Sequence, residues 1–170
     1  MATTFEALAT VTVGSGGAAN IEFTSIPGTY TDLVLKISAK GSTANTFENY
    51  ILEVNGAQTN LSGRHLYGTG SAAGSGTYSS GDGSIFSVPS NVTANTFGSA
   101  EIYIPNYAGS NNKSMSIDNV SENNATAGQQ NLQAELWSNA AAITSLKLTM
   151  SSSGNYVQYS TATLYGIKNS

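Results

Sequence analysis

Short runs in which apolar and polar residues alternate with a period of two recur along almost the whole chain. Clear examples are residues 21–23 (Ile-Glu-Phe), 102–104 (Ile-Tyr-Ile) and 146–150 (Leu-Lys-Leu-Thr-Met). Successive side chains of a β-strand point to opposite faces of a sheet, so the pattern is typical of strands with one buried face. The sequence therefore predicts an all-β fold, an antiparallel β-sandwich of jelly-roll type with about nine or ten strands.

The alternation also predicts which side chains face the core. In the first strand, Phe5, Ala7, Ala9, Val11 and Val13 fall on one face. Near the end of the chain, the leucines of residues 132–136 alternate with Gln and Glu, so the leucines are expected inside and the polar residues outside. A helix is the alternative only for residues 127–142, where apolar residues lie four apart. Gly and Asn residues within that segment weaken the helical interpretation.

Turn and loop signals divide the strands. Asn55-Gly56 is the strongest short hairpin signal, because a type I′ turn needs two residues at positive φ. Residues 68–83 are rich in Gly and Ser and carry little apolar surface, so we expect an exposed loop there. The last strand is expected to be long, from Tyr156 to Ile167.

Composition limits the classes of function. The 170 residues suit a single sandwich domain over residues 1–170. Charged residues make up 9 % of the chain, against roughly 25 % in an average domain. With a net charge of −4 and six scattered basic residues, nucleic acid is not an expected partner. No apolar run of membrane-spanning length and no signal peptide is apparent, so synthesis in a cytoplasm without membrane association is expected.

Residues for catalysis or metal binding are scarce. His65 is the only histidine and no cysteine occurs, which leaves no multi-histidine or thiolate metal site. No Gly-x-Ser-x-Gly motif accompanies His65. A glycosidase needs two carboxylates across a sugar, but Glu53, Glu101 and Glu135 are all expected to point outward into solvent. We therefore expect neither an enzyme nor a cofactor.

Aromatic side chains are the best candidates for contacts. Tyr103 is expected to point outward, Tyr107 follows a Pro-Asn pair in a loop, and Trp137 follows Leu136 and so is expected on the exposed side. Tyr78 lies in the glycine-rich loop. Such rings pack between subunits or stack on sugars. Both roles remain open for these four residues.

Three segments resemble a group of small proteins of tailed, often marine, bacteriophages. They are residues 21–33 (IEFTSIPGTYTDL), 98–107 (GSAEIYIPNY) and 154–167 (GNYVQYSTATLYGI). The first is similar to the motif F-x-S-I-P-x-T-Y-T-x-L of that group. The resemblance implies a jelly-roll-like virion structural protein of decoration or tail-fibre type, without a catalytic motif.

Under this resemblance, the expected function is that of a capsid decoration (cement) protein located on the virion. The expected partners are further copies of the chain, as a homotrimer, and the major capsid protein or tail proteins. Phe5, Ile26 and Pro27 are the expected contacts with the capsid. The alternative is a tail-fibre or tail-tip receptor-binding protein that touches host glycan through the loop at residues 68–83.

Overall fold

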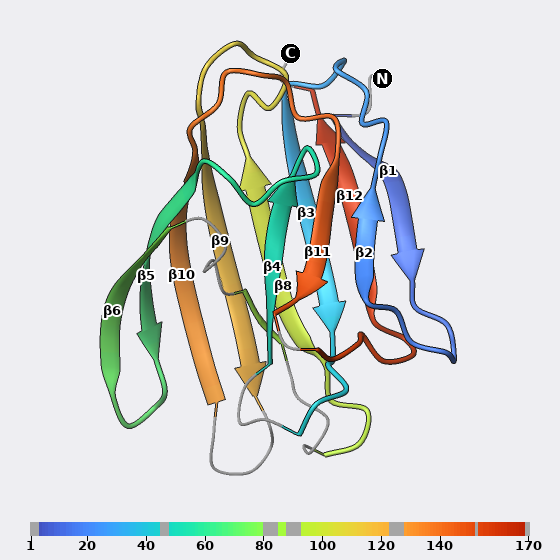
Figure 1. Ribbon diagram of the computed structural model, residues 1–170, viewed down its shortest axis with the longest axis vertical. Helices are drawn as coiled ribbons and strands as arrows, with labels where there is room; N and C mark the ends of the chain where they lie inside the picture. The colour runs from blue at the N-terminus through green and yellow to red at the C-terminus, as the bar shows by residue number, and fades with distance from the viewer. Residues whose placement is uncertain are drawn as a thin grey trace.

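The structure, a computed structural model, describes residues 4–44, 48–79, 85–87, 93–122, 128–151 and 153–168, with residues 85–87 described by their backbone alone. Within these residues the chain forms strands and no helix, and hence no helix that could cross a membrane (Figure 1). The twelve strands are β1 (Phe5–Thr12), β2 (Asn20–Phe23), β3 (Asp32–Ala39), β4 (Glu48–Val54), β5 (Leu61–Gly68), β6 (Ala73–Ser79), β7 (Ile85–Ser87), β8 (Gly98–Ile104), β9 (Lys113–Glu122), β10 (Gly128–Trp137), β11 (Leu146–Met150) and β12 (Thr161–Ile167).

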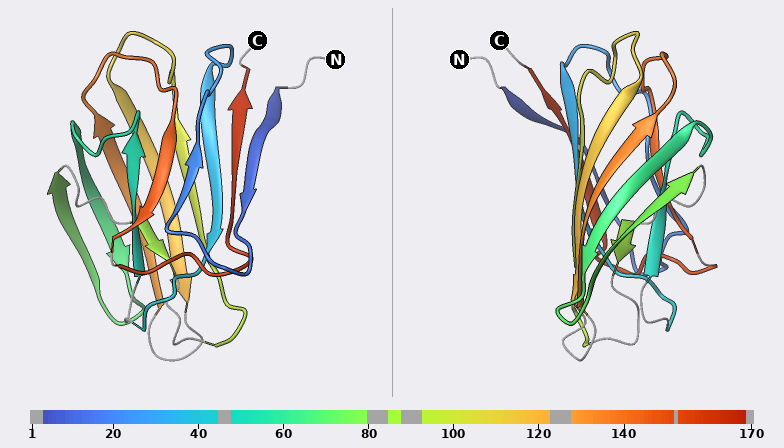
Figure 2. Two further views of the ribbon diagram at one scale, coloured as in Figure 1. Left: turned by 45° about the vertical axis from the view of Figure 1, so that its right-hand side comes forward. Right: turned by 90° about the vertical axis from the view of Figure 1, so that its left-hand side faces the viewer.

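The strands form two antiparallel sheets packed face to face, as the two views of Figure 2 show. One sheet has eight strands in the order β1-β12-β3-β8-β9-β10-β5-β6, and the other has four in the order β2-β11-β4-β7. Without β1, β12 and the β9–β10 hairpin, the remaining orders are β3-β8-β5-β6 and β2-β11-β4-β7, which is jelly-roll order. The predicted all-β sandwich is confirmed, with two or three strands more than expected.

The core lies between the sheets and matches the alternation in most strands. Leu33 and Leu35 of β3 and Ile102 of β8 are fully buried from one sheet, and Ile21 and Leu148 from the other. Each such side chain contributes about 1.5–3 kcal/mol when removed from water. The facing predicted for β2, β3, β8 and β11 is therefore confirmed, and it holds the sandwich together.

Strand β10 faces the opposite way from the prediction. Gln133, Glu135 and Trp137 point inward and are 5 %, 3 % and 3 % exposed, whereas Leu132 and Leu136 are 54 % and 37 % exposed. A period-two pattern is equally consistent with either facing, and a one-residue shift exchanges the faces. In Figure 1, β10, β5 and β6, here called the wing, extend to the left beyond β2, β11 and β4. On the inner side of the wing, Leu61 and Trp137 belong to the hydrophobic core, and the other buried inner positions of β10 carry amides and a carboxyl.

Strand β6 lies within the segment expected to be a loop, and it pairs with β5 throughout its length. Its glycines are covered by rings from β5. A Cβ atom on Gly74 would lie 2.6 Å from the Tyr67 ring, and one on Gly76 would lie 2.7 Å from the His65 ring. These cross-strand rings supply the apolar contact that the glycines lack. The loop prediction was wrong for residues 73–79, because the rings that order them come from a neighbouring strand; residues 80–83 of the predicted loop lie outside the described residues.

The predicted turn at Asn55-Gly56 is present, with φ values of 52° and 79°. Val54 and Ala57 exchange two backbone hydrogen bonds across it, as expected for a two-residue turn. The chain then crosses to the other sheet instead of forming a hairpin. The Asn55 side chain accepts from the backbone N–H groups of Thr144 and Ser145, at 2.8 and 3.1 Å, and so fixes a second loop.

Both ends of the chain depart from the expected pattern. A register shift between Ala7 and Ala9 breaks the predicted apolar face of β1, whose strand residues are mostly exposed. The last strand begins at Thr161 because Tyr159 has a φ of 71°, which ends any extended run. Tyr156 is buried and forms isolated bridges instead.

Candidate binding surface

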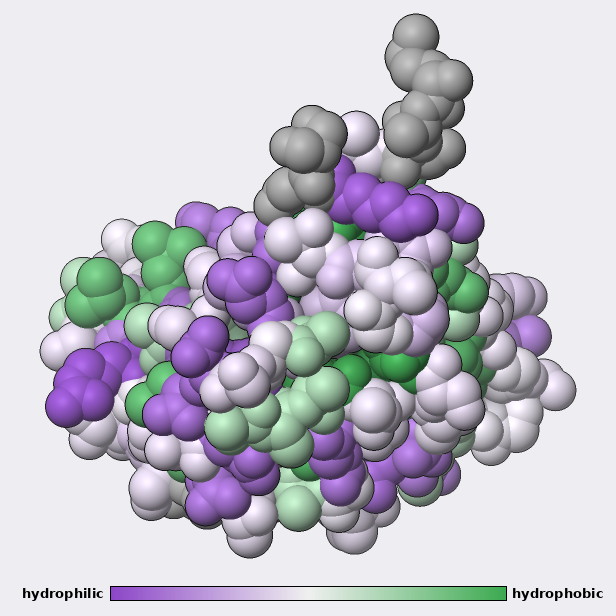
Figure 3. Space-filling model, turned by 90° about the horizontal axis from the view of Figure 1, so that it is seen from above, coloured by the Kyte–Doolittle hydropathy of each residue, from purple (hydrophilic) through white to green (hydrophobic). Residues whose placement is uncertain are grey.

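The outer face of the wing carries leucines where a solvated sheet carries polar groups. Leu66 on β5 lies directly opposite Leu132 on β10, and Leu136 follows four residues along β10. Their exposed fractions are 61 %, 54 % and 37 %. We call these three residues the leucine surface. Figure 3, a view of the molecule from above, shows that hydrophobic side chains reach the surface among hydrophilic ones.

An open groove of about 800 Å³ lies over the leucine surface. It crosses four neighbouring strands, β6, β5, β10 and β9. A smaller hollow of about 190 Å³ continues it along β10 and shares Arg64 and Ala134 with it. The groove is lined by Arg64, His65, Leu66, Ser75, Gly76, Thr77, Ser116, Leu132, Gln133 and Ala134.

The chemistry of the groove suits a protein partner. Its floor is apolar, at Leu66 and Leu132, and its sides carry the hydroxyls of serine and threonine. Arg64 lies within it, and Asp118 on β9 stands opposite Leu132. An apolar centre with a polar rim is the usual arrangement of a protein–protein interface, in which arginine is enriched.

A carboxyl group is buried on the inner side of the wing. The Glu135 side chain accepts a hydrogen bond of 3.2 Å from the Tyr78 hydroxyl. Burial raises the pKa of the Glu135 carboxyl to about 7, and the bond from Tyr78 offsets only part of this effect. Glu135 therefore takes up a proton near neutral pH, unlike an ordinary glutamate.

Amide side chains continue this inner polar layer. Gln129 donates to the Asn131 side chain at 3.0 Å, and Asn131 donates to Asn119 on β9 at 3.1 Å. All three residues are buried. Buried amides are tolerated when they are hydrogen-bonded to one another, which is what this chain of contacts provides.

Two of the four candidate aromatics remain accessible in part. Tyr103 points outward as predicted and is 36 % exposed, and its hydroxyl donates to Asp32 at 2.9 Å. Asp32 is buried, and its carboxylate accepts both this bond and one from the backbone N–H of Asn106. Tyr78 is half-buried and faces inward beside Glu135. Neither ring lines the groove.

The other two aromatics are buried, so neither offers a surface to a ligand or a subunit. Tyr107 is 0 % exposed, and its hydroxyl donates to the carbonyl oxygen of Pro27. The prediction that Trp137 is exposed is wrong, because the reversed facing of β10 turns it inward. There the Lys113 ammonium lies 5.4 Å from its ring centroid and donates to the Gly109 carbonyl at 2.7 Å.

The expected capsid contacts differ in exposure. Phe5 is 43 % exposed and packs on Tyr165, with ring centroids 4.7 Å apart. Ile26 is buried in the core at 6 % exposure, while Pro27 is exposed. Ile26 therefore serves the core, and Phe5 and Pro27 are the accessible members of the set.

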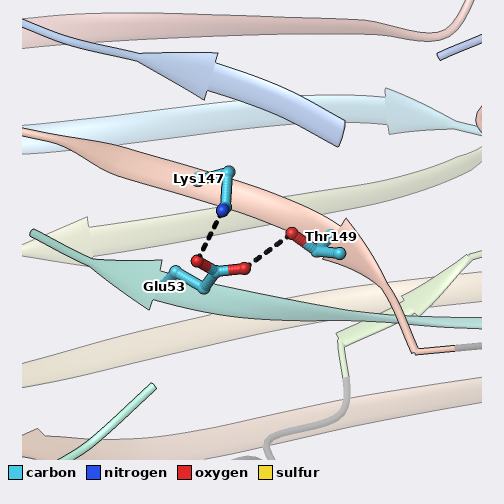
Figure 4. A network of polar contacts seen from close by, with 3 residues as sticks. All are labelled: Glu53, Lys147 and Thr149. Carbon is cyan, nitrogen blue, oxygen red and sulfur yellow. Dashed lines mark hydrogen bonds and ion pairs between the residues drawn. The ribbon is translucent and has the colours of Figure 1, made fainter. Parts of the chain in front are cut away.

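The glutamates do not form a catalytic pair. Glu101 is exposed as predicted and bonds Lys36 at 2.7 Å. Glu53, expected at the surface, is only 8 % exposed and bonds Lys147 at 2.7 Å and the Thr149 hydroxyl at 2.8 Å (Figure 4). It belongs to the four-stranded sheet, whereas Glu101 and Glu135 lie on opposite faces of the larger one. Among the described residues no group of three His, Asp or Glu side chains could hold a metal ion.

No protein family matches the chain, and neither a curated protein nor a solved structure matches it. The resemblance to phage virion proteins therefore stays a prediction. Sequence reasoning missed the leucine surface, because it placed Leu132 and Leu136 in the core. One signal in the sequence could have revealed it. Alternate positions of β9 and β10, which the structure places inside, contain several amides, more than an apolar core usually holds.

Proposed function

We propose that this chain is a non-enzymatic structural protein of a bacteriophage particle, a capsid decoration protein that docks on a neighbouring protein through the leucine surface. The observation that carries the proposal is the reversed facing of β10, which leaves two facing leucines in an open groove. Large apolar side chains gathered on one face mark interaction sites in soluble proteins. Scattered single leucines would carry no such meaning.

The rest of the outer sheet face supports docking at low electrostatic cost. Charged residues are few in the chain as a whole, and serine and threonine dominate around the groove. Covering neutral hydroxyls requires less desolvation than covering ion pairs. Contacts of this kind depend little on salt, which suits a particle exposed to changing media. The partner is the major capsid protein or another copy of the chain, as in a trimer.

The first experiment is the copy number of the chain per purified particle, by quantitative mass spectrometry against the major capsid protein. A ratio near one, or a simple fraction such as one third, is the expected result for a decoration protein. A handful of copies would place the chain on the tail and contradict decoration. Absence from the particle would overturn the proposal.

The second experiment tests the docking surface. The double variant Leu66→Ser and Leu132→Ser should bind particles lacking the protein at least about tenfold more weakly, because two apolar anchors are removed. Its thermal unfolding should match wild type, since both side chains are more than half exposed. The control is Tyr159→Asn, which removes an equally exposed ring elsewhere at a position whose φ of 71° Asn tolerates. Equal binding by the double variant and wild type contradicts the assignment.

A further inference from the structure

We infer that the inner face of the β5–β6 hairpin binds a linear neutral oligosaccharide, through a row of rings formed by Tyr67, His65 and Tyr78. This ring row lies on the opposite face of the wing from the side chains of the leucine surface, although His65 also borders the groove over them. The inference therefore does not depend on the proposed docking function. All three rings are half-buried, so each keeps some surface open.

The rings form a regular series along the hairpin. The centroid of His65 lies 5.9 Å from that of Tyr67 and 6.2 Å from that of Tyr78. The ring planes are tilted by only 36° and 26° relative to each other. Such a series presents its faces in similar directions, as a platform for flat apolar surfaces requires.

Glycines beneath the rings make the series possible. Tyr67 lies over Gly74, and His65 lies over Gly76, so close that a Cβ atom on either glycine would clash with the ring. Tyr78 lies over Gly63 in the same manner, 2.4 Å from where a Cβ would stand. One face of each ring thus rests on backbone, which fixes the ring, and part of each ring stays exposed.

Polar groups of β10 accompany each step of the row. Asn131 pairs with Tyr67 in the strand register, and Gln133 pairs with His65. Glu135 pairs with Gly63, directly below Tyr78, and bonds the Tyr78 hydroxyl. Each ring therefore has a polar side chain of β10 behind it. These side chains are only 0 %, 5 % and 3 % exposed, so they support the rings and leave the contact with the ligand to the rings. The unit repeats every two residues of the strand, about 7 Å.

A neutral sugar chain fits this combination best. Its residues have apolar faces that stack on rings, and hydroxyls at their edges that bond the polar atoms of tyrosine and histidine rings. Asn131 and Gln133 carry no charge, and the raised pKa of Glu135 leaves it largely protonated below neutral pH. An anionic polymer would lack cationic partners here, because the charge of Arg64 lies on the outer face.

The test is an NMR titration of the whole protein, labelled with ¹³C in its aromatic rings. The probes are linear hexasaccharides of β-1,4-glucose, α-1,4-glucose and β-1,4-N-acetylglucosamine. At least one is expected to shift the Tyr67 and His65 ring signals in a saturable way. Tyr67→Ala should weaken this binding about tenfold, and Tyr67→Phe should weaken it less than about threefold, because the ring face makes the contact.

The matched control is Tyr165→Ala. Tyr165 lies in the same tripeptide, Leu-Tyr-Gly, but on the outer face of the sheet beside Phe5, so its loss should leave sugar binding unchanged. If Tyr67→Ala fails to fold, Tyr67→Leu covers Gly74 with apolar volume yet lacks a flat face, and it should fold and lose the binding.

Three results would overturn the inference. One is the absence of ring shifts with all three sugars at concentrations on the order of 10 mM. Another is equal weakening by Tyr165→Ala and Tyr67→Ala. The third is saturable ring shifts with a neutral glycine-serine heptapeptide and none with the sugars, which would identify the row as a peptide site.

Discussion

The two halves of the eight-stranded sheet use the same alternation in opposite ways. In β3 and β8, Leu35 and Ile102 are fully buried, while Lys36 and Glu101 form an exposed ion pair on the outer face. In the wing, amides and a carboxyl face inward and leucines face outward. The inner face is the buried one in both halves, although the wing lies to the side of β2, β11 and β4 in Figure 1 and the inner positions of β10 are mostly polar. Periodicity thus defines two faces, and only the covering layer decides which one is buried.

The two halves should also differ in how they are stabilised. Buried leucines and isoleucines contribute about 1.5–3 kcal/mol each, whereas a net hydrogen bond contributes about 0.5–1.5 kcal/mol. The amide contacts from Gln129 to Asn119 belong to the second kind. The wing is therefore the half expected to tolerate change on its outward-facing leucines and to respond to the protonation of its buried carboxyl.

The largest expected effect compares one leucine from each half. Leu35→Ala should lower the free energy of unfolding by about 3 kcal/mol, because it leaves a cavity in the packed core. Leu132→Ala should change it by about 0.5 kcal/mol or less, because this side chain is 54 % exposed. Urea denaturation of both variants measures the difference. Equal losses would show that the outer face of the wing is covered within the folded chain.

The second effect is the pH dependence caused by Glu135. Its pKa is about 7 in the folded protein and near 4.5 when unfolded, so the folded state holds the proton more tightly. Its contribution to stability is therefore full below about pH 4.5 and is lost as pH rises through 7, by about 3 kcal/mol in all. Glu135→Gln removes this dependence.

The measurement is the free energy of unfolding of wild type and Glu135→Gln from pH 4 to 8, compared by subtraction so that other groups cancel. The free energy of unfolding of Glu135→Gln should rise relative to that of wild type as pH rises. Parallel curves, with a constant difference over the whole range, would show that Glu135 ionises normally and that the inner side of the wing is wet.

The smallest effect concerns two lysines that each bond a glutamate. Burial alone would raise the pKa of Glu53, but the hydrogen bonds from Lys147 and Thr149 outweigh it and lower that pKa. Glu53 therefore stabilises the fold above its unfolded pKa and loses this contribution as pH falls. Lys147→Met should cost about 1 kcal/mol at pH 7.

The comparison is Lys36→Met, which breaks the exposed pair with Glu101 and should cost about 0.5 kcal/mol or less. Thermal unfolding at pH 7 and at low and high salt separates the two, since salt should affect only the exposed pair appreciably. A larger loss of stability for Lys36→Met than for Lys147→Met would contradict the expectation that the less exposed ion pair contributes more.

Local sequence patterns predicted the strands and turns that are determined by their own residues. The burial of Ile21, Leu33 and Ile102 and the turn at Asn55-Gly56 followed from alternation and turn chemistry. Strand β6 could not be predicted, because its glycines are ordered by rings from β5. The leucine surface could not be predicted either, because the sequence shows its leucines but not which face of the sheet they occupy.

The sequence by itself determined the class of fold, because a period of two over short runs allows only strands, and low charge allows only a neutral polar surface. The tertiary structure alone decided which face of each strand is buried. Leu132 is exposed and Trp137 is buried on the same strand, and no local property of either residue distinguishes these outcomes. The reason is that burial depends on what lies against each face of a sheet: the inner face of β10 is buried although it carries amides, and its outer face is exposed although it carries leucines.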